Sequence, residues 1–235
     1  MIPMILALMV VVAGCSSGGS TAAGSSTGSG GSSASGEVTL TMNPKEGDTY
    51  TYVTKIGDAA QAVEMTMSMK AAKVTADDIL METKFDSMSM GGQPMPPQVM
   101  DSMKKMVIKT TMDHMGKTLK TEVEGAPPGA EEQFKNSGNS TPTAYPGHAI
   151  KVGDTWTADT NVQGMPVKMT YKLTKVEDVN GMNAAIIECT PDGTTKVKFD
   201  GPMTMSIEVA TGMPINVKAN MVDGAKKASM EMTRK

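Results

Sequence analysis

The stretch Met203–Val209 reads Met-Thr-Met-Ser-Ile-Glu-Val, so apolar and polar side chains alternate along it. Successive side chains of a β-strand point to opposite faces of a sheet, and this alternation predicts a strand with one apolar and one polar face. Residues 167–173 and 215–221 alternate in the same way. Together these segments predict an antiparallel sheet that buries one face and exposes the other.

Glycine turns divide the second half of the chain into segments of strand length. Asn180-Gly181 is the strongest signal, because both residues tolerate the positive φ angles of a two-residue hairpin. Further turns at Gly193, Gly201, Gly212 and Gly224 follow at spacings typical of antiparallel sheets. We predict strands near residues 155–162, 166–178, 183–190, 194–199, 203–210, 214–222 and 226–233.

One motif occurs twice. Residues 45–50 read Lys-Glu-Gly-Asp-Thr-Tyr, and residues 151–156 read Lys-Val-Gly-Asp-Thr-Trp. We interpret each as a turn that opens a strand, in which the aspartate caps the turn and the aromatic ring enters the core. A catalytic or metal-binding role for these aspartates is disfavoured, because no partner residues lie nearby in the sequence. The repetition predicts two similar halves, at about residues 37–125 and 149–235.

The predicted fold class is all-β with minor α: a curved antiparallel sheet or half-barrel, built from two similar halves within one domain at residues 37–235. Residues 96–106 begin with proline and carry apolar residues at helical spacing, which predicts a short helix. A second short helix is expected at residues 129–135. Residues 136–148 form a connector rich in Pro, Gly, Ser and Thr. Whether the sheet closes is left open.

The first residues read as a targeting segment. Residues 1–14 form an uncharged apolar run, too short to cross about 30 Å of hydrocarbon as a helix. Val12-Ala13-Gly14-Cys15 resembles the bacterial lipobox, although no Lys or Arg precedes it. That resemblance implies a signal peptide at residues 1–14 and acylation of Cys15. The alternative is an ordinary secretory signal in which Cys15 is merely a small apolar residue.

A tether follows the cysteine. Residues 16–36 contain only Ser, Gly, Thr and Ala, which predicts a flexible coil with an end-to-end distance of about 25 Å. Together with the lipidated cysteine, this tether spans residues 15–36. It would hold the domain away from a membrane surface. The residue after the cysteine is Ser16. An acidic residue at this position would favour the inner membrane, so we expect the outer membrane, with the domain in the periplasm or on the cell surface.

Composition excludes several function classes. The net charge of −3, with signs interspersed, argues against nucleic acid as a partner. Only 3% of residues are aromatic, which leaves little material for stacking bases or sugars. The chain holds two histidines, and residues 37–235 lack the Gly-x-Ser-x-Gly, phosphate-loop and His-Glu-x-x-His motifs. We therefore expect no enzyme activity and no cofactor. Cys189 lies in an apolar strand and is expected to be a buried, inert thiol.

Methionine is the unusual component, with 25 in the chain. One hypothesis is that these flexible side chains simply fill the core. A second is that they line a deformable concavity for an acyl chain or a partner's apolar segment, with the helix carrying Met100, Met103 and Met106 as its lid. The candidate lining residues are Met65, Met67, Met69, Met169, Met203 and Met205.

A third hypothesis is soft-metal binding. Met112, His114 and Met115 place two thioethers and an imidazole at a predicted hairpin tip, and thioethers favour Cu(I). The alternative is a turn histidine with incidental methionine neighbours.

The motifs together resemble an uncharacterised family of bacterial lipoproteins that carries a domain-of-unknown-function label. The likeness comprises the lipobox, the tether, the two Lys-x-Gly-Asp-Thr-Tyr/Trp half-repeats, and hairpins at Gly116 and Gly212. It implies a curved antiparallel sheet and no known activity. A remoter analogy of shape is to the lipoprotein-localisation carriers.

The sequence thus predicts a non-catalytic envelope lipoprotein, anchored to a membrane by its lipid. Its partner would be a lipid, another hydrophobic ligand, or an envelope protein. The alternatives are a periplasmic Cu(I)-binding protein and a purely structural envelope protein.

Overall fold

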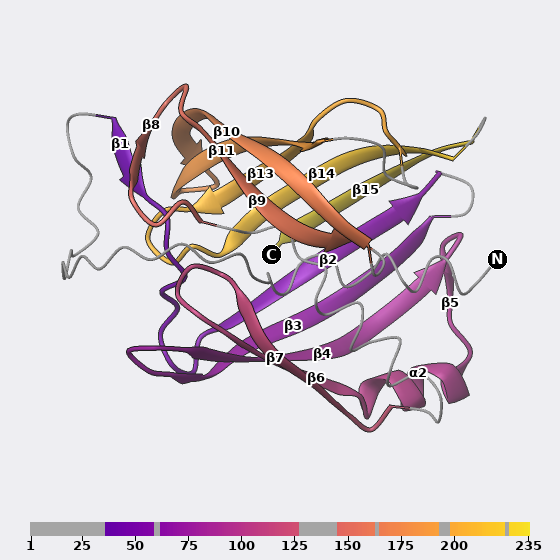
Figure 1. Ribbon diagram of the computed structural model, residues 1–235. Helices are drawn as coiled ribbons and strands as arrows, with labels where there is room; N and C mark the ends of the chain where they lie inside the picture. The colour runs from indigo at the N-terminus through magenta and orange to yellow at the C-terminus, as the bar shows by residue number, and fades with distance from the viewer. Residues whose placement is uncertain (1–35, 59–61, 127–144, 163–164, 193–197, 224–225) are drawn as a thin grey trace.

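The computed structural model describes residues 36–58, 62–126, 145–162, 165–192, 198–223 and 226–235. These residues are mostly β-strand with one helix, which confirms the all-β fold class (Figure 1). Several predicted segments lie outside the described residues. They are the signal peptide, Cys15, nearly all of the tether, the helix expected at residues 129–135 and most of the connector. Among the described residues, no helix has the length and apolar character needed to span a bilayer.

Each half contributes a series of antiparallel strands to one large sheet. The first half supplies β2 (Thr49–Gly57), β3 (Val63–Val74), β4 (Ile79–Met90), β6 (Val107–Met112) and β7 (Thr118–Glu124). The second half supplies β9 (Thr155–Val162), β10 (Met165–Val179), β11 (Met182–Asp192), β13 (Met203–Glu208), β14 (Pro214–Asp223) and β15 (Lys226–Arg234).

The shorter elements lie beside this sheet. β5 (Gln93–Pro94) pairs with β4, and β12 (Lys198–Phe199) pairs with β14. β1 (Glu37–Thr39) and β8 (Ala149–Lys151) form a separate two-stranded sheet. The helix α2 (Pro97–Lys104) begins at a proline, and it confirms the helix predicted within residues 96–106.

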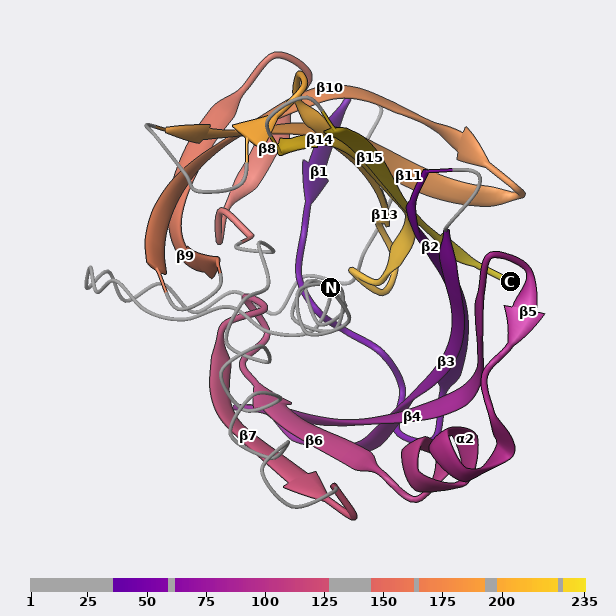
Figure 2. The ribbon, with the colours of Figure 1, turned by 90° about the vertical axis from the view of Figure 1, so that its right-hand side faces the viewer.

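The strand order is β7-β6-β4-β3-β2-β15-β14-β13-β11-β10-β9. Neighbours within each half are adjacent in sequence apart from the short elements, whereas β2 and β15, the first and last long strands, pair at the centre. Figures 1 and 2 show the resulting sheet curving strongly. No ladder joins β7 to β9 in the part of the chain that the structure describes, so the curved sheet is open there.

The predicted one-sided alternation is confirmed. Along β3, residues Val63, Met65, Met67 and Met69 are buried while the side chains between them are partly exposed. β13 shows the same pattern. Buried side chains from both halves form one continuous apolar cluster, which places the core on the inner side of the curve.

The predicted turns at Asn180-Gly181, Gly201 and Gly212 have the expected left-handed glycines, whereas those at Gly193 and Gly224 lie outside the described residues. Asn180 and Gly181 have φ angles of 56° and 80°, as a two-residue hairpin with two left-handed residues requires. The backbone amide of Lys45 donates to Asp48 Oδ2 over 2.9 Å, and the amide of Lys151 donates to Asp154 Oδ2 over 2.8 Å. Both aspartates therefore cap their turns. The duplication of whole halves stays a prediction.

We predict that Gly212→Ala destabilises the fold more than Gly181→Ala. Both glycines have left-handed φ angles, 68° and 80°, so alanine is strained at each position by about 1–2 kcal/mol. Only at Gly212 would the new Cβ lie 2.2 Å from the carbonyl oxygen of Thr41, whereas nothing lies within 4 Å at Gly181. Urea unfolding should show an additional loss of about 1–3 kcal/mol for Gly212→Ala. Equal losses would mean that the segment around Thr41 does not pack there.

Candidate functional site

The six candidate lining methionines all lie on the inner face of the curved sheet. They come from β3, β10 and β13, and each is at most 5% exposed. All six belong to the apolar cluster that runs through both halves. The structure thus brings residues from distant parts of the chain onto one surface, while ligand binding at that surface stays a prediction.

An additional stretch of chain occupies the inner face, and we call residues 38–42 the inner segment. Val38, Leu40 and Met42 are buried in the same cluster as the methionines. Figure 1 shows β1, which overlaps the start of this segment, lying beside β8 at one end of the curved sheet. The alternation Val-Thr-Leu-Thr-Met could have revealed an extended segment, but its place on the inner face depends on contacts remote in sequence.

Hydrogen bonds hold the inner segment to both halves. Val38 pairs with Ile150 in the small β1–β8 sheet. The amide of Met42 donates to the carbonyl oxygen of His114 over 2.8 Å, and the amide of Asn43 donates to that of Thr211 over 2.8 Å. The inner segment and Asn43 therefore contact both halves of the domain.

Tyr145 reinforces this arrangement. Its hydroxyl donates to the carbonyl oxygen of Gly212 and lies 3.7 Å from the sulfur of Met42. Its backbone amide donates to the carbonyl oxygen of Met115 over 3.1 Å. Tyr145 is buried, and this one residue connects the second-half turn and the inner segment through its side chain with the first-half hairpin through its backbone.

His114 has a structural role in the hairpin between β6 and β7. Its Nδ1 lies 2.7 Å from the carbonyl oxygen of Met42, and its Nε2 lies 2.9 Å from that of Thr75. A neutral imidazole donates one of these bonds, and the doubly protonated ring donates both. The ring would have to turn away from a carbonyl before a nitrogen could bind Cu(I). Metal binding by Met112, His114 and Met115 stays untested, and this geometry favours the turn histidine.

No acidic, thiol or imidazole cluster offers an alternative metal site in the described ranges. Groups of three or more His, Cys, Asp or Glu side chains suited to a metal ion are absent there.

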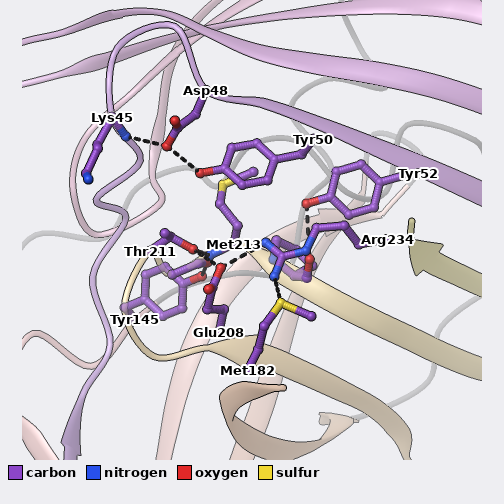
Figure 3. A network of polar contacts seen from close by, with 12 residues as sticks. Lys45, Asp48, Tyr50, Tyr52, Tyr145, Met182, Glu208, Thr211, Met213 and Arg234 are labelled. Carbon is purple, nitrogen blue, oxygen red and sulfur yellow. Dashed lines mark hydrogen bonds and ion pairs between the residues drawn. The ribbon is translucent and has the colours of Figure 1, made fainter. Parts of the chain in front are cut away.

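A partly buried ion pair lies where the two halves meet (Figure 3). Arg234 Nη1 is 2.9 Å from Glu208 Oε2, and the two side chains are 8% and 20% exposed. Thr211 Oγ1 donates to the same carboxylate oxygen over 2.6 Å. The guanidinium also lies 5.5 Å from the ring centre of Tyr50 and contacts the sulfur of Met182. These partners compensate for the removal of both charges from water.

The buried hydroxyl and thiol groups of the core are not activated. Burial raises the pKa of the Tyr52 phenol far above its usual range, and this hydroxyl donates to the carbonyl oxygen of Pro214 over 3.1 Å. Burial, followed by the Asp48 carboxylate, raises the pKa of Tyr50. Burial likewise raises the pKa of the Cys189 thiol. All three groups stay protonated at neutral pH, and the expectation of a buried, inert Cys189 is consistent with this environment.

We predict strong coupling between Arg234 and Glu208. Removing either partner alone, by Arg234→Met or Glu208→Gln, removes a charge-assisted hydrogen bond from a partly buried site and should cost about 1–3 kcal/mol of unfolding free energy. The double variant should lose less than the sum of the two single losses. Chemical denaturation of the four proteins measures this coupling. Additive losses would show that the ion pair does not form in solution.

Comparisons with known proteins add a partial family match. The model of a family of unknown function (DUF6263) matches residues 130–232, which include the second-half strands from β8 to β14 and all but the last two residues of β15. The expected similarity to a family without assigned function is thus found for this part of the chain. A search of curated proteins found no match.

One similar solved structure comes from Vibrio parahaemolyticus and is provisionally described as an outer membrane lipoprotein-sorting protein domain. It is 12% identical, with a TM-score of 0.32, and the similarity covers 82% of this chain and 85% of that one. This similarity is too low to support an argument about function.

Proposed function

We propose that this protein is a non-catalytic, lipid-anchored lipoprotein of the bacterial envelope that binds an apolar ligand on the inner face of its sheet. The observation that carries the proposal is the continuous apolar cluster on the inner side of the sheet, whose buried methionines come from both halves. Thioether side chains are flexible and polarisable, so such a surface can adapt to an acyl chain or to an apolar segment of another protein.

The helix α2 lies at the margin of this surface. Met100 and Met103 are half-buried and pack against the inner cluster, and Met106, just after the helix, is 1% exposed. The helix buries no residue of its own completely. An element held by a few half-buried side chains moves more easily than a sheet strand, which suits a cover over the inner face.

The anchor part of the proposal rests on the sequence. The lipobox-like residues before Cys15 and the Ser/Gly tether support attachment to a membrane by acyl chains, and three such chains give an anchor far stronger than one. Ser16 favours the outer membrane, with the domain in the periplasm or on the cell surface. The tether leads directly into the inner segment, so the proposed anchor and the proposed binding surface are neighbours along the chain.

We predict that Cys15 carries the lipid. Metabolic labelling with radioactive palmitate should mark the full chain, and Cys15→Ser should abolish the label because the acylated thiol is gone. Cys189→Ser is the matched control, since it removes the only other cysteine and should leave the label unchanged. A Cys15→Ser protein that still carries palmitate would contradict the anchor.

We predict that an apolar ligand accompanies the protein from the membrane. Native mass spectrometry of the extracted full chain should show a bound lipid that leaves on collisional activation, whereas covalent acyl groups should remain. A folded protein that repeatedly shows no releasable ligand would favour the purely structural alternative, in which methionines only fill the core.

A further inference from the structure

Five threonine hydroxyls are buried without a hydrogen-bond partner. They belong to Thr54, Thr83, Thr110, Thr118 and Thr121. Buried polar groups nearly always have a partner, because leaving one unpaired costs free energy. All five lie on first-half strands. The described second-half strands contain no buried side-chain oxygen or nitrogen that lacks a hydrogen-bond partner. The two walls of the curved sheet therefore differ in polarity.

Four of these hydroxyls are neighbours, and we call Thr83, Thr110, Thr118 and Thr121 the hydroxyl patch. Thr110 and Thr121 are directly opposite each other on β6 and β7, which places their Cβ atoms about 5 Å apart. Thr110 also faces Met81, two residues from Thr83, so Thr83 is its diagonal neighbour at about 7 Å. Thr118 is opposite Met112, two residues from Thr110.

The hydroxyl patch shares the inner face with the apolar cluster. Thr83 lies between buried Met81 and Phe85 along β4, and Thr110 lies between buried Ile108 and Met112 along β6. The unpaired hydroxyls thus lie beside thioether and aliphatic groups. This combination suits a molecule that has both an apolar chain and a hydrogen-bonding group.

Charged side chains of the same strands lie on the opposite face. Lys109 pairs with Glu124 over 2.7 Å, and Lys120 pairs with Glu122 over 2.9 Å, on the outer, solvent side. Lys109 is also the strand partner of Glu82, again on that side. The hydroxyl patch therefore has no cation on its own strands to neutralise a buried anion.

We propose that the hydroxyl patch donates hydrogen bonds to the ester carbonyl of an acyl-glycerol ligand whose chain lies along the inner methionines. This inference rests on the proposed function and names the class of its ligand. An ester carbonyl accepts hydrogen bonds from hydroxyls without bringing a charge into the core, whereas an unpaired carboxylate there would be strongly disfavoured.

The test uses isosteric substitutions in the full chain carrying Cys15→Ser, which keeps attached acyl chains out of the measurement. Thr83→Val and Thr110→Val remove the hydroxyls and preserve side-chain shape. Thr111→Val, on the outer face of the same strand, is the matched control. Thr110→Ser keeps a hydroxyl and should retain binding. The probes are a long-chain monoacylglycerol, the corresponding free fatty acid, and the corresponding hydrocarbon.

We expect the parent protein to bind the monoacylglycerol more tightly than the hydrocarbon. The double variant Thr83→Val/Thr110→Val should lose about tenfold in affinity for the ester, as the loss of two hydrogen bonds implies, and should bind the hydrocarbon unchanged. Its unfolding temperature should not fall, because the substitutions remove unpaired buried hydroxyls. Thr111→Val should bind like the parent.

Other outcomes separate the two proposals. If the parent protein binds none of the three probes, both the apolar ligand and the ester contact are wrong. If it binds them and the double variant binds the ester equally well, the hydroxyls contact only water and this inference alone fails. Tighter binding of the free fatty acid, lost in the double variant, would overturn the ester as the ligand class. If the double variant does not fold, the single variants test the ester contact. Loss of the preference for the ester over the hydrocarbon in Thr110→Val, with retention in Thr110→Ser, would support the contact, and an unchanged preference in Thr110→Val would contradict it.

Discussion

The ladder between β2 and β15 is the interaction on which the rest of the structure depends. It pairs the first long strand with the last, and thereby joins the two series of strands into one large sheet. The Arg234–Glu208 ion pair and the Tyr52–Pro214 hydrogen bond lie beside this ladder. Because the ends of the chain meet at the centre of the sheet, the free edges belong to β7 and β9, in the middle of the sequence.

Register within each ladder decides which chemistry faces inward. A shift by one residue would turn every side chain to the other face of the sheet. In β4 and β6 such a shift would bring Glu82 and Lys109 into the apolar cluster, at a large cost in free energy. The charged outer face therefore helps to hold the methionines, and with them the unpaired threonines, on the inner face.

Sequence periodicity predicted the local structure well, because alternation and turn chemistry act over a few residues. The strand expected at residues 183–190 is β11, and the Asn180-Gly181 hairpin has the expected φ angles. The pairing of β2 with β15 and the Arg234–Glu208 contact could not be predicted, since they join segments with no local signal for each other. The threonines of β6 look like ordinary strand residues in the sequence, and only burial shows that they lack partners.

The inner segment lies between the proposed anchor and the proposed binding surface along the chain. Val38, Leu40 and Met42 share the cluster that a ligand would contact, so a ligand on this face must pack against the segment or displace it. The segment is held by the short β1–β8 ladder and by a few hydrogen bonds near Met42, whereas each sheet strand is held by long ladders. Elements with few bonds open at lower free energy than core strands. Displacement of the inner segment therefore requires less free energy than opening the sheet, and the tether that reaches it runs directly to the proposed membrane anchor.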